Sequence, residues 1–558
     1  MNIVILKKNA EHYKKMLQSK GFEDESIIFD QVRFGRDNDK IDFEFNGTIS
    51  NELINALIEI SKELNDIVGL RECEKLKMLI DQNDTTIIKS LKTFRKSLEE
   101  YLLKDHLDGW VYRLTENNIF IPFLVSNIVH SPSNPATGEQ AAVKVYYDFN
   151  SPKFSSRHGT RKEFFIFYLK DIHGYTLSTI LAKKGLFKET KELQSRYNNQ
   201  IALYEQYSRQ IGAQFIGNGS SESMDSRTYR KIKNDKLVVD EEPNRPNEFN
   251  QTTRTALNKG SRMDLGYFDD DNITESDDFK VMVHRIPYHP FIKMFSLAHH
   301  ECVWMLADEI VPYEYTSDLS DKLVLPEDHK DLIDILINDA DIVLDDIVGN
   351  KSGGTAILSK GAAGLGKTLT AEVYAECVQK PLYSVHAGQL GIKPEEIEKR
   401  LEKILDNAEK WKAILLLDEA DVYIRRRDND MSHSAIVAAF LRKIERYNGI
   451  LFMTTNREND VDEAIASRCS AILKYELPSD DELFRIWTVL SNHYKIEMSN
   501  ELINKLIDNI DNMVGRDVKE LLKLAARYKS QRNVEIDYDI FRKCAIFRGL
   551  SFKGKVNK

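Results

Sequence analysis

The stretch Gly361-Ala-Ala-Gly-Leu-Gly-Lys367-Thr368 is the strongest structural signal in this sequence. It fits the pattern G-x-x-x-x-G-K-[ST] at every fixed position. Thr355-Ala-Ile-Leu-Ser before it predicts a short strand, and Leu369-Thr-Ala-Glu-Val-Tyr-Ala-Glu after it predicts a helix. Glycines let backbone amides wrap a phosphate, and the N-terminus of a helix adds a favourable dipole. The sequence therefore predicts a phosphate-binding loop between a strand and a helix.

This loop supplies the candidate nucleotide contacts. Lys367 would reach the β- and γ-phosphates, and the Thr368 hydroxyl would ligate Mg²⁺. A chance glycine-rich turn is the alternative, and the strand and helix on either side argue against it. The candidate contacts are Gly361, Ala362, Ala363, Gly364, Leu365, Gly366, Lys367, Thr368 and Leu369.

A second motif is the run Trp411-Lys-Ala-Ile-Leu-Leu-Leu-Asp418-Glu419. Its apolar part predicts a buried strand, and two acids follow at the carboxyl end of that strand. Asp418 would hold Mg²⁺, mostly through water, and Glu419 would polarise the attacking water as general base. A strand followed by an acidic turn is common in any fold. The spacing along the chain between Lys367 and Asp418 makes the pair of motifs specific.

Three further polar residues follow in order. Asn456 ends a third apolar run, Gly449-Ile-Leu-Phe-Met-Thr-Thr-Asn456, and could bind the γ-phosphate or position the water. Arg468 could reach the γ-phosphate of a neighbouring subunit, because a guanidinium is always charged and forks onto phosphate oxygens. Arg516 begins a helix in the C-terminal part and could fold onto the same phosphate. A solvated surface arginine is the alternative for either arginine.

In this order and at these spacings, the motifs resemble the AAA+ ATPases and, within them, the AAA clade. The clade-level resemblance rests on Leu417-Asp-Glu-Ala-Asp421, Thr455-Asn-Arg457 and the Asp-x-Ala-Ile-x-x-Arg pattern at 462–468. A closer resemblance is to AAA proteins of fungal, bacterial and phage genomes, and it covers about residues 280 to 530. In such proteins the segment at Asp345-Asp-Ile-Val-Gly349 lies beside adenine, which implies Ile347, Val348 and Gly349 as base contacts.

Two stretches depart from the family pattern. Many AAA unfoldases carry an aromatic-apolar-glycine loop that grips a polypeptide, whereas the corresponding stretch Leu390-Gly-Ile-Lys-Pro-Glu-Glu has no aromatic residue. The clade also shows two neighbouring arginines after the asparagine strand, whereas only Arg468 stands there. The sequence therefore predicts no aromatic pore paddle and a single arginine finger.

Length and composition bound the remaining possibilities. The chain has 558 residues, of which 42% are hydrophobic and 30% charged, which indicates about three to four globular domains. A net charge of -10 disfavours binding of nucleic acid or of an anionic membrane by charge alone. Five scattered cysteines with no CxxC spacing indicate reduced thiols, and no apolar run is long enough to span a membrane. We expect a cytoplasmic protein.

The pattern of apolar and polar residues along the chain predicts four parts. A helix-rich segment over 1–105, opened by a strand, precedes an α+β region over 106–324 with long polar loops near 218–278, which a short strand at 236–240 interrupts. An α/β ATPase core over 325–477 and a helical lid over 478–558 follow. His299-His-Glu-Cys302 looks like a metal cluster, but four consecutive residues of a helix point in four directions and cannot share an ion.

The predicted fold class is thus an α/β P-loop (AAA+) nucleotide-binding domain with a C-terminal helical lid, preceded by a large α+β N-terminal region. The resemblance implies ATP and Mg²⁺ as cofactors and a homohexameric ring. The expected function is ATP hydrolysis that remodels a protein or protein complex. Two alternatives stay open: a clamp-loader or helicase-like role on nucleic acid, and a slow, ATP-gated assembly scaffold.

Overall fold

A computed structural model describes most of the chain. It covers residues 2–26, 29, 33–34, 40–44, 50–81, 86–103, 110–115, 118–133, 138–154, 160–222, 229–240, 252–255, 282–338, 354–391, 393–426, 431–458, 460–532 and 535–553. Among these residues, no helix combines the length and the apolar character that crossing a membrane requires.

The N-terminal module packs helices on a small antiparallel sheet of order β1-β3-β2. Its strands are β1 (Asn2–Leu6), β2 (Arg33–Phe34) and β3 (Lys40–Glu44), and its helices are α1 (Ala10–Ser19), α2 (Glu23–Ser26), α3 (Asn51–Glu63) and α4 (Ile67–Asp81). The Ser50 hydroxyl caps α3 by accepting from the amide of Leu53. Ile5, Tyr13 and Leu57 are fully buried at the centre of the module.

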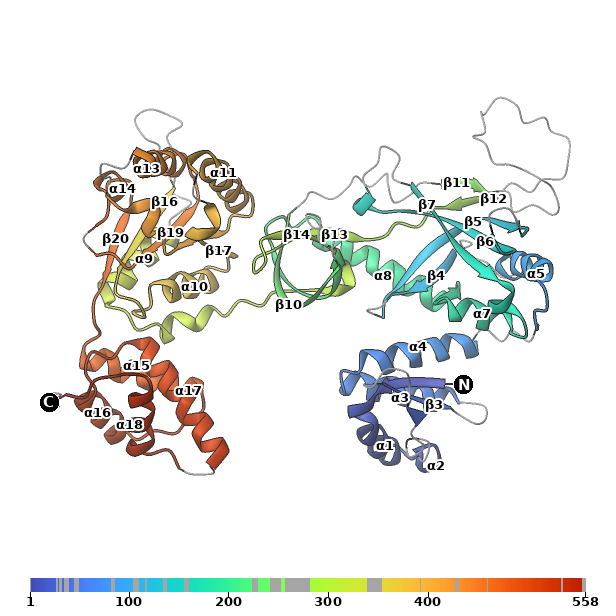
Figure 1. The fold of residues 1–558 in the computed structure, drawn as a ribbon, viewed down its shortest axis with the longest axis horizontal. Helices are drawn as coiled ribbons and strands as arrows, with labels where there is room; N and C mark the ends of the chain where they lie inside the picture. The colour runs from blue at the N-terminus through green and yellow to red at the C-terminus, as the bar shows by residue number, and fades with distance from the viewer. Residues whose placement is uncertain are drawn as a thin grey trace.

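A second antiparallel sheet follows, of order β7-β6-β5-β4-β8. Its elements are α5 (Leu91–Leu103), β4 (Trp110–Leu114), β5 (Phe120–Ser131), β6 (Ala142–Asn150), β7 (Thr160–Tyr168), α6 (Leu169–Ile172), α7 (Leu177–Lys183), β8 (Leu186–Lys188) and α8 (Lys191–Tyr207). Aromatic and β-branched residues are frequent in these strands, which suits a pleated and largely buried surface. Figure 1 shows α8 running from this sheet to the next one.

The third sheet, which we name the middle sheet, has the order β14-β13-β10-β9-β15. Its strands are β9 (Gln214–Glu222), β10 (Tyr229–Val239), β13 (Phe291–Ser296), β14 (Glu301–Leu306) and β15 (Ile310–Pro312), whereas β11 (Thr252–Thr255) and β12 (Met282–Arg285) form a separate two-stranded sheet. It curls into a ring in the centre of Figure 1.

The middle sheet corrects two expectations. Part of the region expected as polar loops, near 218–278, forms the β9–β10 hairpin, which extends well beyond the short strand expected at 236–240, because Ile232, Leu237 and Val239 bury one face of it. Residues 223–228, 241–251 and 256–281 lie outside the described residues. The segment His299–Cys302 is not helical. It forms the β13–β14 turn and the start of β14, with His300 at a φ of 57°.

The α/β core is a parallel sheet of order β17-β18-β19-β16-β20, which confirms the predicted fold class. Its elements are α9 (Glu327–Asn338), β16 (Thr355–Gly361), α10 (Lys367–Cys377), β17 (Leu382–His386), α11 (Pro394–Lys410), β18 (Ile414–Asp418), α12 (Asp421–Ile424), α13 (Met431–Ile444), β19 (Ile450–Thr455), α14 (Glu463–Ala466) and β20 (Ala471–Tyr475). Separate buried clusters line the two faces of the sheet, one under α11 and α13 and one under α10.

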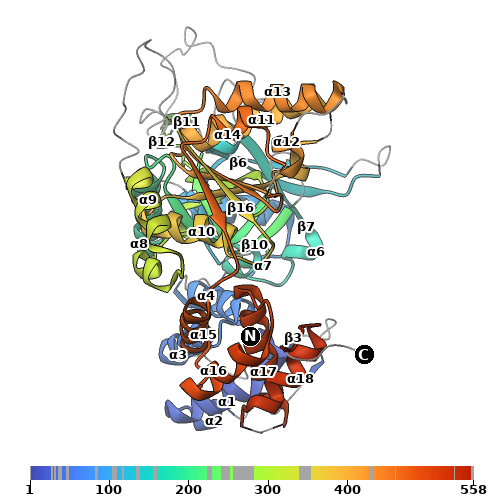
Figure 2. The same ribbon diagram turned by 90° about the vertical axis from the view of Figure 1, so that its left-hand side faces the viewer.

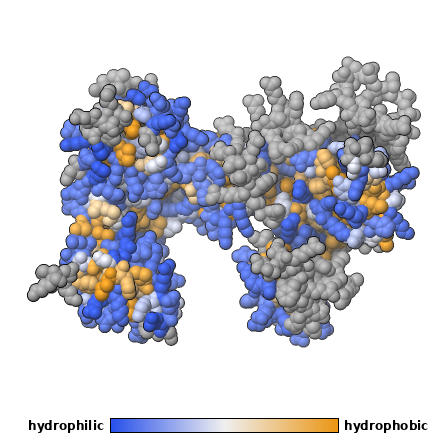
Figure 3. Space-filling model, viewed as in Figure 1, coloured by the Kyte–Doolittle hydropathy of each residue, from blue (hydrophilic) through white to orange (hydrophobic). Residues whose placement is uncertain are grey.

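The lid is all helical: α15 (Asp480–His493), α16 (Asn500–Asn509), α17 (Gly515–Arg532) and α18 (Tyr538–Phe547). Ser479 and Glu482 form a capping box that starts α15 directly after the last strand of the core. Trp487 and Phe541 meet edge to face at 5.4 Å in the lid's own apolar centre. Figure 2 shows the lid beneath the core, and apolar residues gather on the lid in the view of Figure 3.

Candidate nucleotide-binding site

A cavity of about 970 Å³ lies between the core and the lid. Its polar end is formed by the loop after β16 and the carboxyl ends of β18 and β19. Its apolar end is formed by the segment before α9 and by α15. The residues that line it include Leu323, Leu325, His329, Ala363, Gly364, Leu365, Gly366, Lys367, Thr368, Leu369, Asp418, Glu419, Thr454, Asn456, Tyr475, Ile486, Val489 and Arg516.

The loop between β16 and α10 needs glycine at three positions. Gly361, Gly364 and Gly366 have φ values of 150°, 88° and 97°, where a side chain would be strained. At Gly361 a Cβ would also come within 2.3 Å of the Tyr475 carbonyl oxygen. Gly366 directly precedes α10, so the first amides of this 11-residue helix face the cavity end of the loop.

Lys367 closes this loop on itself. Its Nζ donates to the carbonyl oxygens of Gly361 and Ala362, both at 2.7 Å, and to Asn456 Oδ1 at 3.0 Å. Burial lowers the pKa of Lys367, and the nearby Asp418 carboxylate opposes that shift. The lysine on one motif and the asparagine on another are therefore in direct contact.

Asp418 is the centre of a hydroxyl cluster. Its Oδ1 accepts from Thr368 Oγ1 at 3.0 Å and from Thr454 Oγ1 at 2.5 Å. His386, at the end of the neighbouring strand β17, places Nδ1 3.8 Å from Asp418 Oδ2. A carboxylate and a threonine hydroxyl side by side supply the oxygen ligands that Mg²⁺ prefers. The residues present thus fit the predicted metal.

Glu419 and Asn456 are held by hydrogen bonds from the backbone. The Glu419 amide donates to Thr454 Oγ1 at 3.0 Å, and Glu419 has a positive φ of 54°. The Asn456 amide donates to Asp421 Oδ1 at 3.2 Å. These contacts tie the ends of β18 and β19 together, so that the two side chains line the same cavity.

The two arginines lie in different places. Arg516 lines the cavity from the lid, and its backbone amide approaches the Gly364 carbonyl oxygen at 3.4 Å. Arg468 is not among the residues that line the cavity. Its guanidinium donates to the Ala464 carbonyl oxygen at 3.0 Å and lies 3.5 Å from Glu445, with a side chain about 34% exposed.

The base contacts implied by the resemblance, Ile347, Val348 and Gly349, lie outside the described residues. Within the described residues, the apolar end of the cavity is formed instead by side chains that the sequence analysis did not single out: Leu323, Leu325, Tyr475, Ile486 and Val489. Thr454 was also missed. A hydroxyl two residues before the strand-end asparagine is its only signal in the sequence.

The comparisons with known proteins bear on this half of the chain. Residues 357–477 match the model of the "ATPase family associated with various cellular activities (AAA)". These residues form an AAA domain. The AAA domain thus runs from the middle of β16 to just past β20 and contains the loop, both strand-end motifs and Arg468.

Two curated relatives match at low identity. A "Mitochondrial sorting homolog" of Caenorhabditis elegans is 27% identical over 32% of this chain and 54% of its own length. A protein of Methanothermobacter marburgensis named as a 26S proteasome regulatory subunit homolog is 26% identical over 31% of this chain and 49% of its own. The chain spans about half the length of these relatives.

Among solved structures, the crystal structure of the FIGL-1 AAA domain in complex with ADP covers 42% of this chain and 85% of its own. It is 19% identical, with a TM-score of 0.34.

Proposed function

We propose that this chain binds ATP with Mg²⁺ in the cavity of its AAA domain and hydrolyses it to ADP and phosphate. The observation that carries the proposal is the contact of Lys367 with Asn456 beside the Thr368–Asp418–Thr454 cluster. Lys367 supplies a buried cation for phosphate, and Thr368 and Asp418 supply a pair of oxygen ligands for a metal. Glu419, the next residue along the chain, supplies a second carboxylate.

In this mechanism Lys367 exchanges its loop carbonyl partners for the β- and γ-phosphates, which compensates its buried charge. Thr368 and Asp418 would hold Mg²⁺, which neutralises charge on the phosphates when it is bound. Glu419 takes a proton from the attacking water, and Asn456 orients that water or the γ-phosphate. Arg516 reaches the phosphates from the lid.

We further propose that Arg468 completes the site of a neighbouring subunit in a ring, most simply a homohexamer. Two features support this. Arg468 does not line the cavity of its own chain, and its present partners are an exposed carboxylate and a backbone carbonyl that water can replace. A guanidinium supplied in trans stabilises charge in the transition state of phosphoryl transfer.

The use of the energy is proposed to be remodelling of a protein or protein complex in the cytoplasm. The names of the two relatives, which refer to sorting and to a proteasome subunit, support a protein substrate. All five cysteines are free thiols, in keeping with the proposed compartment. A role on nucleic acid is the second candidate function, and a slow, ATP-gated assembly scaffold is the third.

Steady-state ATPase assays separate these candidates. The purified chain is assayed alone and with unfolded protein, single-stranded DNA or RNA, with Lys367→Ala as the blank. Stimulation of turnover by unfolded protein supports remodelling, and stimulation by nucleic acid overturns it. Turnover no faster than that of Lys367→Ala under all four conditions favours the scaffold. A Glu419→Gln chain loaded with ATP would then serve to capture the substrate.

A further inference from the structure

The middle sheet is docked onto the AAA domain through a continuous side-chain interface. Asp240, directly after β10, is 7% exposed, and its Oδ1 accepts from Trp411 Nε1 at 3.0 Å and lies 3.1 Å from Lys410 Nζ. Lys410 Nζ also donates to the Asp240 backbone carbonyl. Lys410 ends α11, and Trp411 precedes β18, which leads to Asp418.

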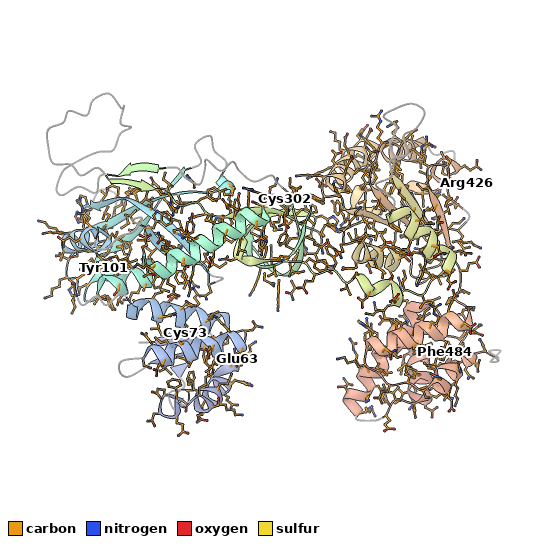
Figure 4. The ribbon with its side chains drawn as sticks, turned by 180° about the vertical axis from the view of Figure 1, so that it is seen from behind. Glu63, Cys73, Tyr101, Cys302, Arg426 and Phe484 are labelled. Carbon is orange, nitrogen blue, oxygen red and sulfur yellow. The ribbon has the colours of Figure 1, made fainter. Side chains whose placement is uncertain are left out.

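An aromatic cluster surrounds this polar contact. Trp411 is 2% exposed, and its ring lies 4.6 Å from Phe295 of β13 and 5.4 Å from Tyr383 of β17. His300, at the tip of the β13–β14 turn, lies 5.5 Å from the same tyrosine ring. Cys302, labelled in Figure 4, packs partly buried against the same cluster. The apolar core of the AAA domain therefore continues into the middle sheet.

The backbone also makes a close approach. Gly212, two residues before β9, has a φ of 80°, and a Cβ there would lie 2.5 Å from the Trp411 carbonyl oxygen. Only glycine combines this conformation with this distance. A flexible linker between two domains would not need such a fit, because few contacts cross a boundary of that kind.

A second contact holds the other end of the interface. Glu376, in the last turn of the helix that begins at Lys367, accepts from Tyr313 at 2.6 Å, from Lys236 Nζ at 3.0 Å and from the Thr316 amide at 3.2 Å. Burial alone would raise the pKa of Glu376, but the hydrogen bonds from Tyr313 and Lys236 outweigh it and lower that pKa.

The middle sheet is also joined to the sheet β4–β8 by buried contacts. Helix α8 contributes Tyr204 to the core beside the middle sheet and Tyr197 to the core beside the sheet β4–β8. Tyr197 bonds both the amide and the carbonyl of Tyr288 at 3.0 Å. His289 is buried between the two, with its ring stacked on Phe149 at 4.3 Å. Figure 1 shows these parts as one continuous arm that extends from the core.

We infer that the region from β4 to β15 is a rigid lever fixed to the AAA domain, anchored at the start of β18 and the end of α10. The lever moves with the core in every nucleotide state, and the movement of the ATPase cycle is confined to the lid and to contacts between subunits. A small rotation of the core is then amplified at the far end of the arm. This inference goes beyond hydrolysis, and it rests on the proposed function in one respect, because it takes the cavity to bind nucleotide and the lid to move.

Pulsed dipolar spectroscopy on the full chain tests the lever. Spin labels on clickable amino acids leave the five cysteines in place. One pair, at exposed Lys231 of β10 and Lys399 of α11, spans the interface, and a second pair, at Lys399 and Lys529 of α17, spans core and lid. Each is measured without nucleotide, with ADP and with a non-hydrolysable ATP analogue.

We expect one narrow distance for the first pair, with no shift between the three states. The combined change Lys410→Met and Trp411→Ala should broaden it even without nucleotide, whereas Lys403→Met, on an exposed lysine of the same helix, should not. A nucleotide-dependent shift of the first pair, or a narrow distance that survives the combined change, overturns the lever. If the first pair is unchanged but the core–lid distance also stays constant, the proposed nucleotide-driven movement of the lid is wrong, whereas the rigid attachment of the lever to the core stands.

Discussion

Thr454 donates a 2.5 Å hydrogen bond to Asp418 Oδ1 and accepts one at 3.0 Å from the amide of Glu419. One hydroxyl on β19 therefore positions both acids at the end of β18. Its oxygen also faces the Thr368 hydroxyl across the shared carboxylate atom. Thr454 is 2% exposed, so its own hydroxyl is shielded from competing water, whereas Asp418 and Glu419 face the cavity.

Thr454→Val should slow hydrolysis while leaving nucleotide binding nearly intact. The change keeps the shape of the side chain but removes the donor to Asp418 and the acceptor for the Glu419 amide. A hydrogen bond to a charged group contributes about 1.5–3 kcal/mol, so we expect kcat to fall roughly 10- to 100-fold. Titration with a fluorescent ATP analogue in the same preparation measures affinity separately.

Thr488→Val is the matched control for this change. It removes a threonine hydroxyl that bonds only the Phe484 carbonyl within the lid helix α15. The control should keep wild-type kcat. Equal kcat in wild type and Thr454→Val would show that Asp418 and Glu419 do not need this hydroxyl.

Lys367→Ala should weaken ATP binding at least about tenfold, because the phosphates lose a charge-assisted hydrogen bond. Calorimetric titration with the non-hydrolysable analogue measures the affinity. Lys360→Ala, on the preceding strand, removes an exposed lysine that donates to the Glu458 carbonyl, and it should bind normally. If affinity and turnover both survive Lys367→Ala, the assignment of the loop is wrong.

Arg468→Ala should bind ATP almost normally and hydrolyse it poorly. The loss of a transition-state guanidinium typically costs roughly 10³-fold in rate. Mixing tests the action in trans. Chains with Arg468→Ala or with Lys367→Ala are each inactive alone, but a mixed ring joins an intact loop to a neighbour's intact finger, so part of the activity should return.

Subunit exchange must be verified in this mixture, for instance by co-purification of two tags. No return of activity after exchange would place the finger in cis or on another residue, and Arg457 is the next to test. A surface arginine without a role predicts near wild-type rates for Arg468→Ala alone.

The sequence predicted the AAA core well because its motifs are local. A few adjacent residues are enough to predict a loop such as Gly361–Thr368 or a buried strand such as β18. Parallel strands then bring the residues at their carboxyl ends together at one edge of the sheet. The same logic placed Asp418 and Asn456 at one edge of the sheet. Thr454 escaped because a threonine is common in strands and its role depends on a partner 36 residues away.

The middle sheet was the harder part. The short strand expected at 236–240 matches the end of β10, but the rest of β9 and β10 is rich in Asn, Asp, Gly, Ser and Lys, which local propensity assigns to loops. They are held by long-range pairing with β13 and β15, which no local pattern reveals. His299 and His300 were expected in a helix for the same reason. The buried contact of Asp240 with Trp411 joins residues 171 positions apart and had no signal in the sequence.

The central claim is that this cavity hydrolyses ATP with Glu419 as the general base. Single-turnover hydrolysis of radiolabelled ATP by the wild-type chain and by Glu419→Gln, with Mg²⁺ and saturating enzyme, measures that step directly. We expect Glu419→Gln to bind ATP as tightly as the wild-type chain and to hydrolyse it at least ~100-fold more slowly. Hydrolysis at near wild-type rate in that variant would contradict it and would direct the search for the base to Asp421.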